Sequence, residues 1–247
     1  MTHRVVVTAG GAGIGAALVR RFAAEGAKVA YCDLAPGEAP DSVLGVQADV
    51  TDEASMGTFL ARAHDHLGGV DVLCANAGTG GPAAPIEDMA YADWRACLDV
   101  NLGGAFLACR WAARAMKAQG SGCILLTSST AGQWGIPSRA PYVTAKWGVL
   151  GLMKTLAAEL GPHGIRVNAI CPGAVEGDRM ERVVAMEAAA RGAAPEAIRA
   201  LYAEGTSMRR WVTAEDIAQT ATFLASDAGR MISGQALAVD GNTERVT

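Results

Sequence analysis

The sequence has few aromatic residues, no long run of like charge and no apolar stretch of membrane-spanning length. Phe, Trp and Tyr make up 5% of its 247 residues, and the formal net charge is only −4. A weakly acidic chain without a basic run does not match nucleic acid or an acidic membrane surface, so we expect neither as a partner. A transmembrane helix needs about 20 apolar residues, so we expect no membrane span.

The cysteines include no C-x-x-C pair, and most of the six lie in apolar runs, where a thiol behaves as a small hydrophobe. The first residues, MTHRVVVTAG, enter an apolar run at once and show no secretory signal. We therefore expect free thiols and a cytoplasmic location. His64 and His66 are two positions apart in a helical stretch and face apart, so we expect no metal site.

The sequence is rich in apolar residues, which make up 51% of it, and in glycine, with 30 residues. Seven runs rich in Val, Ile and Leu are nearly continuous rather than alternating, which is typical of strands covered on both faces. These runs are 4–9, 27–34, 43–50, 70–78, 123–129, 165–173 and 235–241. They predict a parallel sheet of about seven strands.

Helical patterns separate these runs, at residues 13–25, 53–67, 89–119 and 142–160. Alternation of strands and helices predicts an α/β fold, a doubly wound, Rossmann-like parallel sheet with helices on both faces. No linker or repeat interrupts the pattern, so we expect residues 1–247 to form a single domain.

Residues 174–212 depart from the alternation, because two helical pieces, about 178–191 and 195–204, follow the sixth run. Pro195 suits the first position of the second helix. An insertion near the carboxyl ends of such strands usually covers the ligand crevice. We expect this segment to be a mobile substrate lid.

A glycine-rich turn, TAGGAGIG at residues 8–15, joins the first run to the first helix. Glycine lets the backbone turn sharply and approach a ligand, and a helix N-terminus attracts a pyrophosphate. The pattern fits dinucleotide-binding motifs in two registers, which are Gly11, Gly13 and Ala16, or Gly10, Gly13 and Gly15 with Ile14 between the last two.

Asp33 ends the second strand, 18 residues after Gly15. A carboxylate there can bind both ribose hydroxyls of adenosine and repel the extra phosphate of NADP. Ala12 and Leu34 offer no compensating positive charge. We therefore predict NAD as the cofactor.

The stretch PYVTAKWG places Tyr142 and Lys146 on one helical face, and Ser129 ends the fifth strand 13 residues earlier. A free phenol has a pKa near 10, and a nearby ammonium lowers that pKa. Tyr142 and Lys146 therefore fit an acid/base pair, and Ser129 can hold the substrate oxygen beside the phenol.

Several motifs in this order resemble the classical branch of the short-chain dehydrogenase/reductase family over essentially the whole chain. They are TAGGAGIG, DL at 33–34, ADV at 48–50, ANAG at 75–78, DVNLGG at 99–104, TSS at 127–129, YVTAK at 142–146 and NAICPGAV at 168–175. The resemblance implies that Tyr142 is the general acid/base and that Lys146 lowers its pKa and holds the nicotinamide ribose. Asn101 would hold a water that links Lys146 to solvent.

The resemblance also implies cofactor contacts and an assembly. Asp49 and Val50 would flank the adenine, and Leu34 would follow the ribose-binding acid. The cofactor wall and the nicotinamide border would be formed by Asn76, Ala77, Gly78, Pro172, Gly173 and Val175. The long helices at 89–119 and 142–160 would pack against other copies in a homotetramer.

Three positions depart from the family pattern, namely Ala9 for a glycine, Ala75 for an asparagine and Gly177 for a threonine. None of these changes removes a catalytic group. The last one leaves the binding of the nicotinamide carboxamide undefined.

We predict an NAD-dependent oxidoreductase that converts a secondary alcohol, sugar-like or a hydroxy acid, to its ketone. Candidate substrate contacts are Gln133, Trp134, Arg139 and Arg179. For both arginines a solvent-facing or structural role is an open alternative. The rival functions are an NADPH-dependent ketone or 3-oxoacyl reductase and a non-catalytic nucleotide-sensing protein on the same fold.

Overall fold

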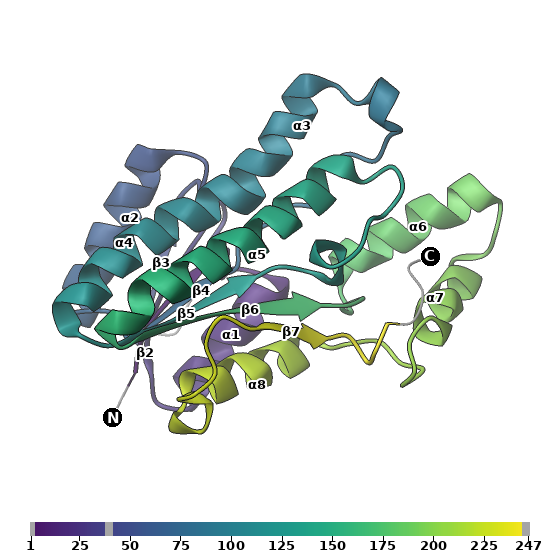
Figure 1. The fold of residues 1–247 in the computed structure, drawn as a ribbon. Coiled ribbons are helices and arrows are strands. Elements are labelled where there is room, and N and C mark those ends of the chain that lie inside the picture. Colours follow the sequence, from purple (N-terminus) through teal and green to yellow (C-terminus); the bar gives the residue numbers. More distant parts are fainter. Residues whose placement is uncertain (1–2, 38–41, 244–247) are drawn as a thin grey trace.

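The fold is built on one sheet of seven parallel strands, in the order β3-β2-β1-β4-β5-β6-β7 (Figure 1). The structure is a computed structural model, and it describes residues 3–37 and 42–243. The strands are β1 Arg4–Thr8, β2 Lys28–Asp33, β3 Val43–Gln47, β4 Val72–Ala75, β5 Gly122–Thr127, β6 Ile165–Pro172 and β7 Ala236–Val239. Six of these strands lie inside their predicted runs, and β5 begins one residue before its run. The predicted parallel sheet is therefore confirmed.

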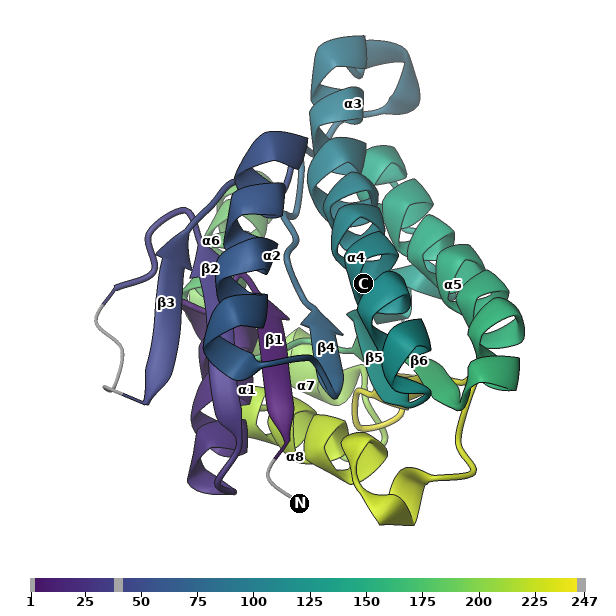
Figure 2. The same cartoon turned by 90° about the vertical axis from the view of Figure 1, so that its left-hand side faces the viewer.

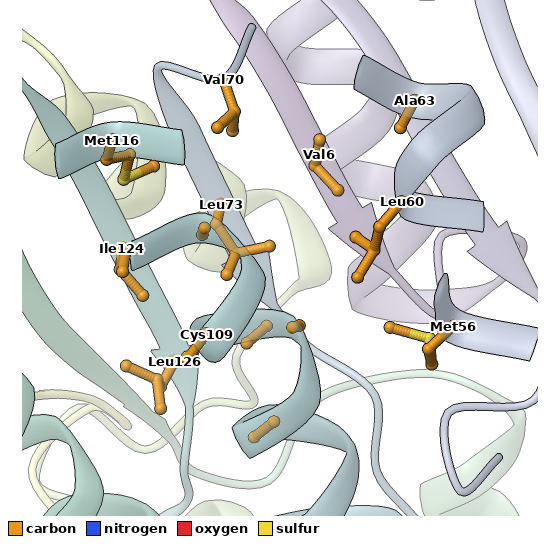
Figure 3. Close-up of a cluster of buried hydrophobic side chains, with 14 of the residues drawn as sticks. Val6, Met56, Leu60, Ala63, Val70, Leu73, Cys109, Met116, Ile124 and Leu126 are labelled. Carbon is orange, nitrogen blue, oxygen red and sulfur yellow. The ribbon is translucent and has the colours of Figure 1, made fainter. Parts of the chain in front are cut away.

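Helices cover both faces of the sheet (Figure 2). The helices α1 Gly13–Ala24 and α8 Ala214–Ala225 pack on one face, and α2 Glu53–Leu67, α4 Gly104–Gln119 and α5 Ala140–Leu160 pack on the other. Side chains of each strand alternate between the two cores, so Val5 and Val7 contact the first layer while Val6 contacts the second. Figure 3 shows the second core, where Val6, Leu73 and Leu126 meet helical side chains.

The predicted helix at 89–119 is interrupted. The chain forms α3 Tyr91–Leu98, a π-helical turn Asp99–Gly103 and then α4. A π turn adds a residue to the helical path and rotates the side chains on either side relative to each other. Periodicity read over the whole stretch cannot detect such a local change.

Helix α8 is absent from the predicted elements. Its start has a clear local signal, because Thr213 and Asp216 form a reciprocal capping box. The buried positions Ile217, Ala221 and Leu224 also follow helical spacing. The helix was therefore detectable from the sequence.

The segment 174–212 contains α6 Asp178–Arg191 and α7 Pro195–Glu204, with the predicted bounds. The two helices lie at the end of the molecule toward which β6 and β7 point (Figure 1). They share a small cluster of their own, formed by Val184, Ala188 and Ile198. The role of this segment as a substrate lid stays a prediction.

No helix in residues 3–37 and 42–243 has the length and apolar character to cross a membrane. Within the same residues, no group of three His, Cys, Asp or Glu side chains gathers around a point where a metal ion could bind. His64 instead lies edge-on against Trp111, with ring centroids 6.5 Å apart. The six cysteines are buried and unpaired.

Candidate active site

The glycine turn lies at the point where the strand order reverses, between β1 and β4, and leads into α1. Gly13 has a φ of +52°. A Cβ on Gly15 would lie 1.8 Å from the carbonyl oxygen of Ala9, and one on Gly10 would lie 2.6 Å from the Tyr31 ring. Glycine is therefore required by shape at Gly10 and Gly15 and by conformation at Gly13.

Ala9 occupies the left-handed region, with φ +54°, although it carries a Cβ. This conformation costs an ordinary residue about 1–2 kcal/mol. We expect Ala9→Gly to raise the free energy of unfolding by about 0.5–1 kcal/mol, because relief of the strain exceeds the entropy that glycine adds to the unfolded chain. Denaturant titration measures the change.

The control for this substitution is Ala61→Gly on the exposed face of α2, where φ is ordinary. We expect it to lower the free energy of unfolding by about 1 kcal/mol. Equal losses in both variants would show that the turn at Ala9 stores no strain.

A cleft of about 550 Å³ begins beside the glycine turn. Six residues predicted to contact the cofactor line it, namely Asp33, Leu34, Asp49, Val50, Ala77 and Gly78. The Asp33 carboxylate accepts hydrogen bonds from the backbone N–H groups of Gly11 (2.9 Å) and Ala35 (3.2 Å), which orient it beside the turn. The cleft thus holds the carboxylate acceptor that the ribose of a dinucleotide requires, whereas only Ala9 of the glycine turn lines it.

The predicted residues at the end of β6 do not line this cleft. Pro172 is buried, and Val175 forms a bridge with Val212. Gly173 lies against the segment after β7, since a Cβ there would come within 2.7 Å of Asp240. A contact of these three residues with nicotinamide stays a prediction.

A hydrogen-bond network joins the carboxyl ends of the three central strands. The hydroxyl of Thr8 accepts from the backbone N–H groups of Asn76 and Ala77, both at 3.0 Å. The Asn76 amide donates to the Thr8 and Ala9 carbonyls, and its oxygen accepts from the Thr127 hydroxyl. Thr8 and Thr127 were not among the predicted site residues, although their position at the ends of strands is a signal that identifies them.

The Ser129 hydroxyl accepts a 3.1 Å hydrogen bond from the backbone N–H of Ala131 and lies near enough to the Tyr142 phenol to lower its pKa. Burial by itself raises the pKa of the Tyr142 phenol, but the positive charges of Lys146 and Arg179, the Ser129 hydrogen bond and Arg139 act against burial, and the pKa is lowered overall. A phenol with a lowered pKa exchanges a proton more easily near neutral pH than free tyrosine does. The structure therefore brings the predicted acid/base residue and its serine together.

Lys146 is almost completely buried, and its Nζ donates a 2.9 Å hydrogen bond to the carbonyl of Thr127. Its Nζ lies 5.7 Å from the centroid of the Tyr142 ring. Burial lowers the pKa of the Lys146 ammonium, and the Tyr142 phenolate opposes that shift. The buried Ser128 hydroxyl donates to the Lys146 carbonyl and holds α5 against β5.

Asn101 lies in the π-helical turn and is buried. Its amide nitrogen donates to the carbonyls of Cys97 (2.9 Å) and Thr79 (3.0 Å). Its Oδ1 is buried without a hydrogen-bond partner. A Cβ on Gly78 would lie 2.8 Å from this oxygen and 3.3 Å from Lys146 Nζ, so both atoms face the same glycine.

The four predicted substrate contacts differ in position. Gln133 is half-buried, and Trp134 is 41% exposed. The guanidinium carbons of Arg139 and Arg179 lie 5.4 and 5.7 Å from the centroid of the Tyr142 ring. Both arginines therefore lie beside Tyr142, the predicted acid/base residue.

The parallel sheet, the glycine turn and the Ser129–Tyr142–Lys146 centre together define a nicotinamide-nucleotide-dependent oxidoreductase. A family model described as "Enoyl-(Acyl carrier protein) reductase" matches residues 8–242. The chain belongs to the short-chain dehydrogenase/reductase family, as the motifs predicted. It is an enzyme that acts on CH–OH groups.

Relatives of known sequence and structure cover nearly all of the chain. Cis-4-hydroxycyclohexanecarboxylate dehydrogenase of Sinomonas cyclohexanicum is 37% identical and covers 96% of this chain and 94% of its own. Probable galactose dehydrogenase of Rhizobium meliloti (strain 1021) is 37% identical, and the match covers 96% of this chain and 93% of that enzyme. The crystal structure of NAD+-bound xylitol dehydrogenase superposes with a TM-score of 0.88 at 30% identity. The match covers 96% of this chain and 97% of the xylitol dehydrogenase chain.

Proposed function

We propose that the chain is an NAD-dependent dehydrogenase that oxidises a secondary alcohol group of a small polar substrate to a ketone. The observation that carries the proposal is the convergence of Ser129, Tyr142 and Lys146. Asp33, in the cleft beside the glycine turn, supports a dinucleotide as the partner in the reaction.

Tyr142 acts as the base in this proposal. The Ser129 hydroxyl, which lies beside the phenol, positions the alcohol oxygen next to it. The phenolate of Tyr142 takes the hydroxyl proton while the C–H bond of the substrate breaks. Bound NAD supplies the hydride acceptor at C4 of its nicotinamide ring.

Lys146 and Asn101 return the proton from the site to solvent. Lys146 uses one N–H for the Thr127 carbonyl and keeps others for a ribose hydroxyl or a water. The unpartnered Oδ1 of Asn101 is an acceptor for a water beside Lys146 Nζ, since a buried acceptor without a partner is costly. A relay from Tyr142 through Lys146 to this water follows.

The choice of NAD over NADP rests on Asp33. Its oriented carboxylate can accept from ribose hydroxyls but repels a 2′-phosphate, and Leu34 beside it is 66% exposed and uncharged. We expect NAD to bind about 100-fold more tightly than NADP. Asp33→Ser should reduce this ratio at least tenfold, because the repulsion and the acceptor are both lost.

Fluorescence titration with NADH and NADPH measures both ratios. The control is Asp65→Asn, which removes a carboxylate from the exposed face of α2. A wild-type preference for NADPH would instead favour the rival function, a ketone or 3-oxoacyl reductase. The description of the matching family model gives that rival a specific basis.

The substrate class follows from the relatives and from the charge of the site. The names of the two similar enzymes, a hydroxycyclohexanecarboxylate dehydrogenase and a galactose dehydrogenase, support a polar cyclic alcohol. The test is NADH formation over a library of sugars, polyols and hydroxy acids. Absence of NADH from every compound, despite tight NAD binding, would support a nucleotide-sensing protein instead.

A homotetramer and a cytoplasmic location also belong to the proposal, on the basis of the family resemblance. Exposed Phe106 on α4 (46%) and Trp147 on α5 (51%) support contacts between copies through these helices. The movement of residues 174–212 over the substrate is likewise proposed, with Arg179 at its site-facing end.

A further inference from the structure

Two arginines from distant parts of the chain meet beside the acid/base residue. Arg139 immediately precedes α5, and Arg179 is the second residue of α6. Their guanidinium carbons lie 5.4 and 5.7 Å from the Tyr142 ring centroid. Two positive charges are thus added to that of Lys146 around one phenol.

Both guanidinium groups face the same loop. Arg139 Nη2 donates a 2.9 Å hydrogen bond to the carbonyl of Gly80. A Cβ on Gly80 would lie 3.2 Å from Arg139 Nη2 and 3.6 Å from Arg179 Nη2. Both nitrogens therefore lie within 3.6 Å of one point, close enough for a single anion to contact both groups.

Neither arginine has a carboxylate partner among residues 3–37 and 42–243. Five other arginines in that part of the chain form ion pairs, namely Arg4, Arg21, Arg110, Arg191 and Arg199. Arg139 and Arg179 also lie at the N-terminal ends of their helices, where the helix dipole disfavours positive charge. Their placement therefore does not serve helix stability.

We propose that Arg139 and Arg179 form a carboxylate-binding subsite, so that the preferred substrate is a hydroxy acid. An arginine binds a carboxylate through paired N–H groups, and the charges of two arginines outweigh that of one carboxylate. Both guanidinium groups lie within one small molecule's length of the phenol. This inference rests on the proposed function, because it assigns the substrate class of the same site.

The test compares each hydroxy acid with its uncharged primary amide. The probes are cis-4-hydroxycyclohexanecarboxylate, 3-hydroxybutyrate and 4-hydroxypentanoate. For at least one pair we expect kcat/KM of the wild type to favour the acid by about tenfold or more. Measured at a pH on the plateau of each variant's own profile, Arg179→Met should lower kcat/KM for that acid by about 10- to 100-fold, mostly through KM, and change the amide less than about threefold.

Arg139→Met should act in the same direction, and the double variant should bring acid and amide close to equality. The matched control is Arg62→Met, which removes one positive charge from the exposed face of α2. It should leave the acid-to-amide ratio unchanged. Equal acid and amide rates in the wild type, or equal losses for both in Arg179→Met, would overturn the subsite.

A second source of the anion is the pyrophosphate of the cofactor. If Arg179→Met weakens NAD binding about tenfold and leaves KM for the acid unchanged, the arginines bind the cofactor and the proposal is wrong. Calorimetric titration of the NADH-loaded enzyme, which cannot oxidise an alcohol, with each acid and amide gives a readout that needs no turnover. Equal affinity for acid and amide in all three pairs would also overturn the subsite.

The pH profile gives an independent readout. Removing the positive charge of Arg179 should raise the pKa of Tyr142, so oxidation of a neutral amide should move to higher pH. An unshifted profile would contradict the position of Arg179 beside the phenol. Failure of the proposed function is distinguishable, since it gives no NADH from any alcohol, whereas failure of the subsite gives NADH from acid and amide equally.

Discussion

Tyr142→Phe should lower kcat for alcohol oxidation by about 1,000-fold, because the substrate hydroxyl loses the group that takes its proton. The ring and its packing stay, so NAD binding and the melting temperature should change little. Stopped-flow and steady-state measurements of NADH formation test the rate, and fluorescence titration tests the binding.

The matched control is Tyr91→Phe, which removes a hydroxyl from an exposed tyrosine stacked on Trp94. It should keep near-normal rates. Near-normal turnover in Tyr142→Phe would show that the proton leaves by another route and that the proposed mechanism is wrong.

The pH dependence of the wild type belongs to the same experiment. Oxidation needs the phenolate, so the rate should rise with pH and level off once the pH exceeds the pKa of Tyr142. This pKa lies below the ordinary value of 10, because the charges of Lys146, Arg179 and Arg139 and the Ser129 hydrogen bond together outweigh burial. The residual rate of Tyr142→Phe should lack this rise.

Gly15→Ala should destabilise the fold by about 3 kcal/mol or more and weaken NAD binding at least tenfold. The new Cβ would lie 1.8 Å from the Ala9 carbonyl oxygen and 2.9 Å from Asn76 Nδ2. Backbone atoms cannot move aside as a flexible side chain can, so the turn must open. Thermal unfolding and NADH titration measure the two effects.

Gly57→Ala on α2 is the matched control, since it adds the same methyl group where no atom outside the local helix backbone lies within 4 Å. It should raise the free energy of unfolding by up to about 1 kcal/mol, because alanine is the better helix former. A Gly15→Ala variant as stable as the wild type would contradict the close packing of the turn.

Much of the fold could be read from local patterns. Strands buried on both faces carry continuous apolar runs, and a glycine-rich turn between a strand and a helix is typical of a dinucleotide-binding fold. These signals predicted the parallel sheet and the helices α1, α2, α5, α6 and α7 close to their bounds. Helix α8 was missed although Thr213 and Asp216 carry a capping signal.

Only the parts of the site that lie close together in the sequence were predictable. The spacing of Tyr142 and Lys146 on one helical face is a local property, and Ser129 follows the strand just before that helix. The π-helical turn around Asn101 was not predictable, because it changes the helical period over only a few residues. The network of Thr8, Asn76 and Thr127 depends on which strands become neighbours.

The family, the succession of strands along the chain and the residues predicted to form the acid/base centre all follow from the amino-acid sequence alone. Each is encoded by residues near one another in the chain or by motifs in a fixed order. The meeting of Arg139, Arg179 and Gly80 beside Tyr142 becomes visible only in the folded molecule, as does the shared position of Asn101 and Lys146 against one glycine. Arg139 and Gly80 are 59 residues apart, and their contact depends on how whole segments pack, which no local periodicity encodes.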